Sequence, residues 1–128
     1  MVKITMNQAV DFSKSIEFFS GTNLPLKGAY KINKIRKALD KETDFYSEKF
    51  REIIDEYSKK DENGDIVFSE DGNEIIIKEE SLEECNKALE DLYNLEVEVD
   101  NYNLKLEDLG EDFECTPDQL EVLMPFME

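Results

Sequence analysis

The chain has 128 residues, of which 40% are hydrophobic and 37% charged, and its formal net charge is −17 at pH 7. This length is typical of one folded domain with its own apolar core, so we predict a single domain over residues 1–128. No apolar run approaches the roughly 18 residues of a membrane-spanning helix, and residues 1–12 lack the layout of a signal peptide. We therefore expect a cytoplasmic protein that does not bind membranes.

The amino-terminal half reads as a short strand followed by two helices. Val2 and Ile4 indicate the strand, and Thr5 with Gln8 forms a capping-box pattern that predicts a helix over residues 5–20, ending before Gly21. After the break at Pro25, residues 26–60 contain no proline, and their apolar residues form one stripe at helical spacing. We expect a long helix over 26–60, whose stripe consists of Ile32, Ile35, Leu39, Tyr46, Phe50, Ile53 and Tyr57.

Residues 59–81, KKDENGDIVFSEDGNEIIIKEES, superficially resemble a calcium-binding loop. An EF-hand loop that starts at Asp61 needs glycine at its sixth position and glutamate at its twelfth, where this chain has Ile66 and Gly72. The dipeptides Asn63-Gly64 and Asp71-Gly72 are instead typical of tight turns, and they bracket short β-branched runs. We predict a β-hairpin over residues 65–78, in which 66–68 pairs with 74–78 around the Asp71-Gly72 turn.

Three further elements are expected in the remainder of the chain. Ser81 begins a second capping-box pattern, which predicts a helix over residues 82–94. Strict alternation of apolar and acidic residues from Leu95 to Asp100, followed by Asn101-Tyr102-Asn103, predicts a hairpin over 95–107. Thr116 and Pro117 open a short helix over 117–124. The predicted class is α+β: a long helix packed against a shorter antiparallel helix, with short antiparallel β-hairpins and flanking helices.

The residue types that most enzymes need do not occur in recognisable patterns. There is no histidine, which is the usual general base near neutral pH and the commonest transition-metal ligand. Neither a phosphate-binding glycine loop nor a nucleophile elbow is present, and Cys85 and Cys115 have no metal or redox spacing. We predict no catalytic residues, no metal site and no cofactor, and we interpret Cys85 as a small core residue.

Charge is distributed unevenly along the chain. Residues 61–128 hold 23 carboxylates but only Lys78, Lys87 and Lys105 as basic side chains. Residues 26–60 carry a small excess of basic groups, and four of them are spaced along the long helix: Lys27, Lys31, Lys34 and Lys41. This basic stretch is either a nucleic-acid footprint, a solvated face, or a surface that docks on carboxylates of this chain or of a neighbouring copy. Because the whole chain is so acidic, we favour a solvated face and predict no direct nucleic-acid binding.

The acidic segments 61–84 and 107–114 are our candidate partner-binding surface, with Phe68 and Tyr102 as apolar anchors. A charge of this size attracts basic protein surfaces at long range. The candidate residues are Asp61, Glu62, Phe68, Glu70, Asp71, Glu74, Glu79, Glu80, Tyr102, Glu107, Asp108, Glu111 and Asp112.

Three stretches carry a resemblance to a known family: LPLKGAYKINKIRKALDKE, then EYSKKDENGDIVFSEDGNEIIIKEES, then NLEVEVDNYNLKLEDL. Over roughly residues 24–109 the chain resembles small phage and prophage proteins from viruses of Gram-positive bacteria, which have no assigned function. The resemblance rests on the layout, the LP-x-K entry and the E-V-E-V-D strand. It implies a virus-encoded protein that acts in the cytoplasm of a bacterial host, and it supplies no catalytic residues.

Two functions compete. One is an inhibitor that binds a host protein with a basic surface, such as a defence nuclease, and imitates the charge of nucleic acid. The other is a virion-assembly, scaffolding or chaperone component that self-associates through its long helix into a homo-oligomer. We favour the inhibitor. An enzyme is disfavoured by the missing chemistry.

Overall fold

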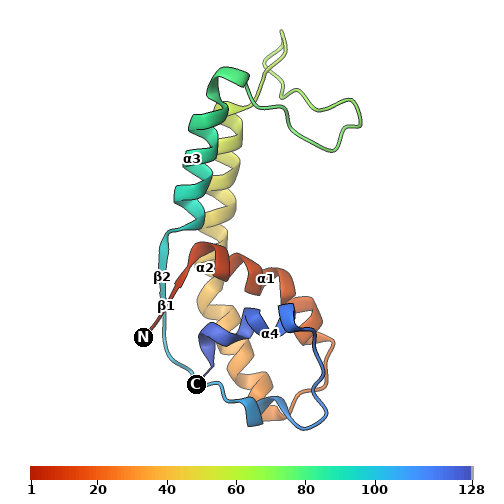
Figure 1. Cartoon of the computed structure of the whole chain (residues 1–128), viewed down its shortest axis with the longest axis vertical. Coiled ribbons are helices and arrows are strands. Elements are labelled where there is room, and N and C mark those ends of the chain that lie inside the picture. The colour runs from red at the N-terminus through yellow and green to blue at the C-terminus, as the bar shows by residue number, and fades with distance from the viewer. Residues whose placement is uncertain (128) are drawn as a thin grey trace. The chain divides into compact units, whose positions relative to one another are not determined.

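The computed structural model describes residues 1–127, and the chain divides into two compact units (Figure 1). Unit 1 comprises residues 1–44 and 95–128, and unit 2 comprises residues 45–94. We predicted one domain over residues 1–128. The helix α2 (Leu26–Tyr57) contributes residues to both units.

Unit 1 contains a two-stranded antiparallel sheet made from segments that are far apart in the sequence. Strand β1 (Val2–Thr5) pairs with β2 (Glu96–Val99), so that Val2 lies opposite Val99 and Thr5 opposite Glu96. Ile4, Val97 and Val99 are buried, as the alternating pattern predicted.

The predicted hairpin over 95–107 is wrong, because β2 pairs with β1 and not with the segment that follows it. Leu104 instead forms a parallel bridge with Met127, and Leu106–Leu109 is a short 3-10 helix. The carboxylate of Asp108 accepts a hydrogen bond of 2.9 Å from the backbone amide of Lys105. Such local side-chain bonds to the backbone compete with strand pairing, and here they turn the chain before a second strand forms.

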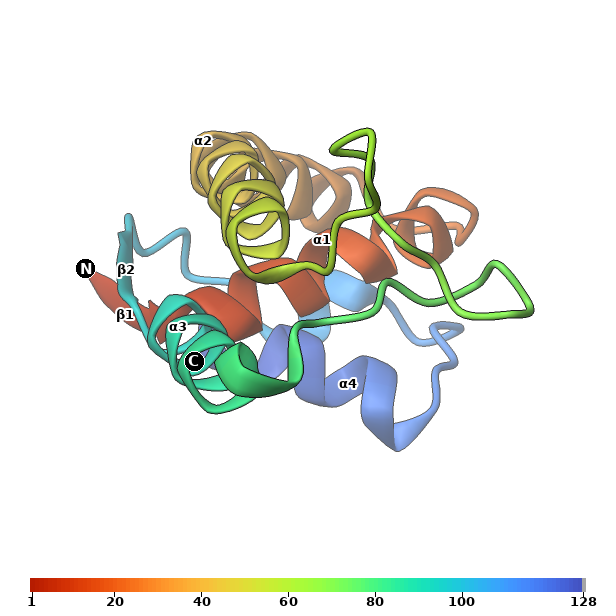
Figure 2. The ribbon, with the colours of Figure 1, turned by 90° about the horizontal axis from the view of Figure 1, so that it is seen from above.

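Helix α1 (Met6–Ser20) begins at the predicted capping box. The Thr5 hydroxyl accepts from the Gln8 amide at 3.2 Å, and the Thr5 amide donates to Gln8 Oε1 at 2.9 Å. Helix α4 (Pro117–Leu123) starts with the same arrangement at Thr116 and continues into a 3-10 turn, Met124–Phe126, so the prediction of a helix over 117–124 is confirmed to within one residue. Within unit 1, α4 lies beside α1 (Figure 2). The rings of Phe12 and Phe126 meet edge to face, with their centroids 5.3 Å apart.

In unit 2 the second half of α2 is followed by two loops and then by α3 (Leu82–Tyr93). The rings of Tyr46 on α2 and Tyr93 on α3 have centroids 5.9 Å apart, as expected for two antiparallel helices side by side. The predicted end of α2 at residue 60 is too late, because the backbone of Lys59 already bonds to Ile76 in the loop region. The capping box at Ser81 is also wrong. A 3-10 turn, Glu79–Ser81, leads into α3, and Ser81 makes no side-chain capping bond.

The buried apolar side chains lie mainly in unit 1. They are Ile4, Met6, Ala9, Val10, Phe12, Phe19, Ile32, Ile35, Leu39, Val97, Val99, Leu104, Leu109, Leu123 and Phe126. Unit 2, all of whose residues the structure describes, adds Cys85 and Leu92. The fold is α+β, with a long helix packed against others, as the sequence predicted.

Candidate functional site

The end of unit 2 formed by residues 58–84, which we call the acidic tip, is organised by three hydrogen bonds between three chain segments. Lys59 donates its amide to the Ile76 carbonyl (2.8 Å), Ile76 donates to Val67 (3.1 Å), and Val67 donates to Lys59 (2.9 Å). Each of these residues is therefore both donor and acceptor in one closed triangle. The triangle joins two loops, 60–66 and 68–75, which point in different directions (Figure 2).

The predicted hairpin over 65–78 exists as the second of these loops. Phe68 and Ile75 form an antiparallel bridge, and the Ser69 amide donates to the Glu74 carbonyl at 2.8 Å. Of the predicted pairing between 66–68 and 74–78 around Asp71-Gly72, the contacts of Val67 and Phe68 with Ile76 and Ile75 are present. Ile66 and Ile77 instead form bridges with Lys60 and Ser58. The first loop is an additional hairpin-like turn, in which Lys60 bridges Ile66.

Glycine and aspartate hold both turns. Gly64 and Gly72 have φ values of +82° and +74°, which side chains with a Cβ rarely adopt. Asp61 Oδ1 accepts from the amides of Asn63 (2.8 Å) and Asp65 (3.0 Å). The calcium pattern at Asp61 is therefore explained by turn formation: its carboxylate is bonded to its own loop.

Asp71 has the same role in the second loop. The Ser69 hydroxyl donates to Asp71 Oδ1, and the Asn73 amide donates to the same oxygen at 3.1 Å. These hydrogen bonds lower the pKa of the Asp71 carboxyl, and the bond from Ser69 has the larger effect. Asp61 and Asp71 therefore shape the loops.

The structure exposes all but one of the carboxylates that we predicted to bind a partner. Those in the acidic tip are Asp61, Glu62, Glu70, Asp71, Glu74, Glu79 and Glu80, and those in unit 1 are Glu107, Glu111 and Asp112. The two groups belong to different units, so they are two separate candidate surfaces.

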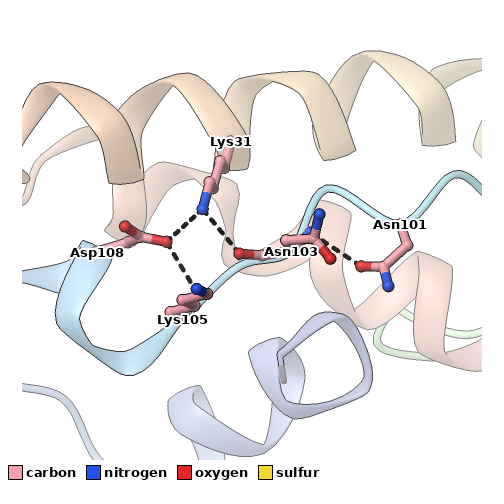
Figure 3. A network of polar contacts seen from close by, with 5 residues as sticks. All are labelled: Lys31, Asn101, Asn103, Lys105 and Asp108. Atoms are coloured by element: carbon pink, nitrogen blue, oxygen red, sulfur yellow. Dashed lines mark hydrogen bonds and ion pairs between the residues drawn. The ribbon is translucent and has the colours of Figure 1, made fainter.

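Asp108 is the exception, and its assignment to a partner-binding surface is wrong. Only 3% of the residue is exposed, and its Oδ2 lies 2.6 Å from the ammonium group of Lys31 on α2 (Figure 3). Lys31 also donates to the Asn103 carbonyl at 2.7 Å. The hydrogen bond from Lys31, together with that from the Lys105 amide, lowers the pKa of Asp108. This carboxylate fastens the 106–109 turn to α2.

Gly28 permits this contact. A Cβ at Gly28 would lie 2.0 Å from the carbonyl oxygen of Asp108 and 2.9 Å from its carbonyl carbon. Only a residue without a side chain allows α2 and the 106–109 turn to approach so closely. The glycine in LPLKGAY, which the sequence did not explain, is therefore a packing residue.

The two predicted apolar anchors differ in exposure. Phe68 in the acidic tip is 53% exposed, whereas Tyr102 in unit 1 is half-buried. The sequence missed three further exposed apolar residues of the acidic tip, namely Ile75, Ile76 and Leu82. We had interpreted Ile75 and Ile76 as strand residues. The signal for their exposure was that the short loop region has little apolar sequence to cover them.

The remaining polar groups in unit 2 have structural explanations. Burial raises the pKa of the Cys85 thiol, which makes the reactive thiolate scarcer. Burial, and then the hydrogen bond to Tyr93, raise the pKa of the Tyr46 hydroxyl. Ser58 is fully buried, donates to the Asp55 carbonyl at 3.3 Å and accepts from Lys60 Nζ at 2.7 Å, which fixes the start of the acidic tip.

Within residues 1–127, no three His, Cys, Asp or Glu residues are grouped in a way that would hold a metal ion. Among the helices of the same residues, none combines the length and the apolar character that crossing a bilayer requires. Comparisons of the chain with models of protein families, with curated proteins and with solved structures find no match.

Proposed function

We propose that this chain is a non-enzymatic, phage-encoded binding protein that inhibits a host protein in the bacterial cytoplasm by stoichiometric binding. The target carries a basic surface of the kind that binds nucleic acid, and the acidic tip imitates that ligand's charge. The observation that supports the proposal is an exposed aromatic residue, Phe68, on a loop whose neighbours Glu70 and Glu74 are exposed carboxylates.

Charge alone would not make such an interface. Exposed ion pairs contribute about 0–1 kcal/mol each, so the carboxylates mainly accelerate and orient the encounter. Most of the affinity in protein interfaces comes from a few apolar anchors, with aromatic residues prominent among them. Phe68 meets that description, and its bridge partner Ile75 is 37% exposed beside it.

The backbone of the acidic tip also suits binding. The triangle of hydrogen bonds and the bonds at Asp61 and Asp71 hold both loops in one shape before a partner arrives. A loop that is already ordered loses less conformational entropy on association, and this raises affinity.

The test is to capture host proteins on the tagged chain, identify a stoichiometric partner, and measure its dissociation constant for designed variants. We expect Phe68→Ala to weaken binding by about 2 kcal/mol, or roughly 30-fold, as for other interface anchors. The matched control is Phe45→Ala, which removes a 42% exposed phenylalanine from α2. Glu70→Lys combined with Glu74→Lys should weaken binding at least about tenfold, and less so at about 0.5 M salt, where screening is severe.

The control for charge is Glu17→Lys combined with Glu121→Lys, which reverses two exposed carboxylates of unit 1. Affinity that is indifferent to the Phe68 and Glu70/Glu74 changes and to salt would contradict the proposal. The acidic tip would then be a solubilising surface only.

The alternative is a role in virion assembly through self-association of helices. Leu82 at the start of α3 is 48% exposed, and Phe45 on α2 is 42% exposed, so both helices present apolar side chains to solvent. An assembly component would form large species that Phe45→Ala and Leu82→Ala dissolve. An inhibitor of the proposed kind would bind its target with Phe45→Ala as it does unmodified, because Phe45 lies outside the acidic tip.

A further inference from the structure

The first half of α2 carries a basic stripe on the face opposite the core. The stripe is defined by five residues spaced three or four apart along the helix: Lys27, Tyr30, Lys34, Lys37 and Lys41. This spacing places them on one side of a helix, and all five are exposed. Ile32, Ile35 and Leu39, which occupy the other side, are buried in unit 1.

Apolar and basic groups are combined in this stripe. Tyr30 is 62% exposed, and the ammonium group of Lys34 lies 5.4 Å from the centre of its ring. Leu26, at the start of the same helix, is 87% exposed. Among residues 1–127, the ion pairs found do not involve Lys27, Lys34, Lys37 or Lys41, although the charge of Lys27 contributes to the lowered pKa of Asp108.

We infer that the basic stripe is a docking surface for the acidic tip of a second copy of this chain. This inference rests on the proposed function, because it uses the same acidic tip. It adds that the basic stripe of a second copy regulates how much of the tip is free to bind a target. Unit 2 holds 16 carboxylates and 6 basic side chains, so its net charge is opposite in sign to that of the basic stripe. Both surfaces also expose apolar side chains among the charges, Phe68 on one and Tyr30 on the other.

Nucleic acid is the competing occupant of a basic stripe with an exposed tyrosine. The chain has 32 carboxylates against 15 basic side chains, so its field repels phosphates at long range. The acidic tip of another copy instead brings a local group of carboxylates on a loop. At physiological salt the Debye length is about 8 Å, so nearby opposite charges still attract while the net repulsion of the two chains is screened.

The contact would join two different patches, so it is heterologous. Every copy carries both patches, and successive copies therefore add head to tail into chains or close into rings. Because the acidic tip is covered in such an assembly, self-association competes with capture of the host target. The basic stripe thereby limits how much free tip is present at high protein concentration.

Two charge-reversed variants test this by sedimentation velocity in about 0.1 M salt, over protein concentrations from about 10 μM to 1 mM. The first is Lys34→Glu with Lys37→Glu, and the second is Glu70→Lys with Glu74→Lys. We expect the unmodified chain to gain mass with concentration, and each variant alone to associate at least about tenfold more weakly. An equimolar mixture of the two variants should associate again, because the intact tip of the first meets the intact stripe of the second.

The matched control is Lys14→Glu with Lys87→Glu, which makes the same charge change outside the basic stripe and should associate as the unmodified chain does. Circular dichroism is used to check that every variant is folded before its association is measured. The inference is overturned if the unmodified chain stays monomeric to 1 mM, or if its association is unchanged by Lys34→Glu with Lys37→Glu. It is equally overturned if a 20-nucleotide single strand binds the unmodified chain but not that variant, which would assign the stripe to nucleic acid.

A further arm separates this inference from the proposed function. A lysine-rich peptide serves as a probe that needs the acidic tip but not the stripe. Binding of this peptide without self-association defeats the inference and leaves the proposed function standing. Indifference of target binding to the Glu70 and Glu74 reversals defeats the proposed function, whatever the state of self-association.

Discussion

Unit 1 and unit 2 share one helix, α2, but are stabilised differently. In unit 1, α2 buries Ile32, Ile35 and Leu39. In unit 2, the later stripe residues Tyr46 and Ile53 are only half-buried, and Phe45 is largely open to solvent. A continuous apolar stripe therefore does not guarantee a continuous core. Burial requires enough apolar sequence on the facing elements, and the loops of unit 2 are short of it.

Truncation of one stripe residue in each unit should show the largest difference in stability between the two units. Leu39→Ala removes a fully buried side chain and should lower the free energy of unfolding by about 2–5 kcal/mol. Because Ile53 belongs to the same apolar stripe, the sequence alone predicts an equal cost for Ile53→Ala. Because Ile53 is only half-buried, we now expect a loss below about 1.5 kcal/mol. Urea denaturation of both variants measures the two values, and equal losses would show that unit 2 has a core as effective as that of unit 1.

A second experiment tests how closely unit 1 is packed. Gly28→Ala places a methyl group where the Asp108 carbonyl lies, and it should destabilise the fold by about 1–3 kcal/mol, the usual cost of overpacking. Gly21→Ala is the control, since its nearest neighbour would lie at an ordinary 3.5 Å. Thermal unfolding of both variants measures the effect. A Gly28→Ala protein as stable as the unmodified one would mean that the 106–109 turn moves away without cost.

The smallest expected effect concerns the buried ion pair of unit 1. Asp108→Asn keeps an oxygen acceptor but loses the charge that Lys31 and the Lys105 amide stabilise. The pKa of Asp108 is lowered from 3.8, so the ionised carboxylate stabilises the fold above that pH, and this contribution is lost as pH falls through the lowered value. The variant should therefore be less stable than the unmodified chain at pH 7, and the gap should close in acid.

Denaturant midpoints at pH 7 and near pH 3 measure this gap. Glu52→Gln in unit 2 is the control, because its pair with Lys49 is exposed on both sides and contributes little at any pH. A gap of the same size at both pH values would show that Asp108 contributes through its hydrogen bonds alone.

Local signals in the sequence were sufficient for most elements. The capping boxes at Thr5 and Thr116, the turn glycines Gly64 and Gly72 and the alternation before Asp100 each depend on residues only a few positions apart. They located helices α1 and α4, the second loop of the acidic tip and the strand β2. The same local signals predicted the exposure of the site residues of unit 2, because loops rich in carboxylates remain in contact with water.

The errors arose where distant residues decide the outcome. The alternating pattern of residues 96–99 would allow them to pair with any strand that has one apolar face. Nothing near them in the sequence indicates that their partner is residues 2–5. Asp108 looks like any other member of an acidic run, and only the approach of Lys31, 77 residues away, makes it a core residue. Ser81 carries a capping pattern, but the 3-10 turn before it leaves the hydroxyl without that role.

The triangle of backbone bonds in the acidic tip joins its two loops through main-chain groups alone. Lys59, Val67 and Ile76 contribute only main-chain groups to these three bonds. Lengthening a surface loop costs little, about 0.6 kcal/mol for each doubling. Either loop should therefore accept an inserted peptide while the other keeps its form, which makes this end of the molecule a scaffold on which two recognition sequences can diverge, or be grafted, independently.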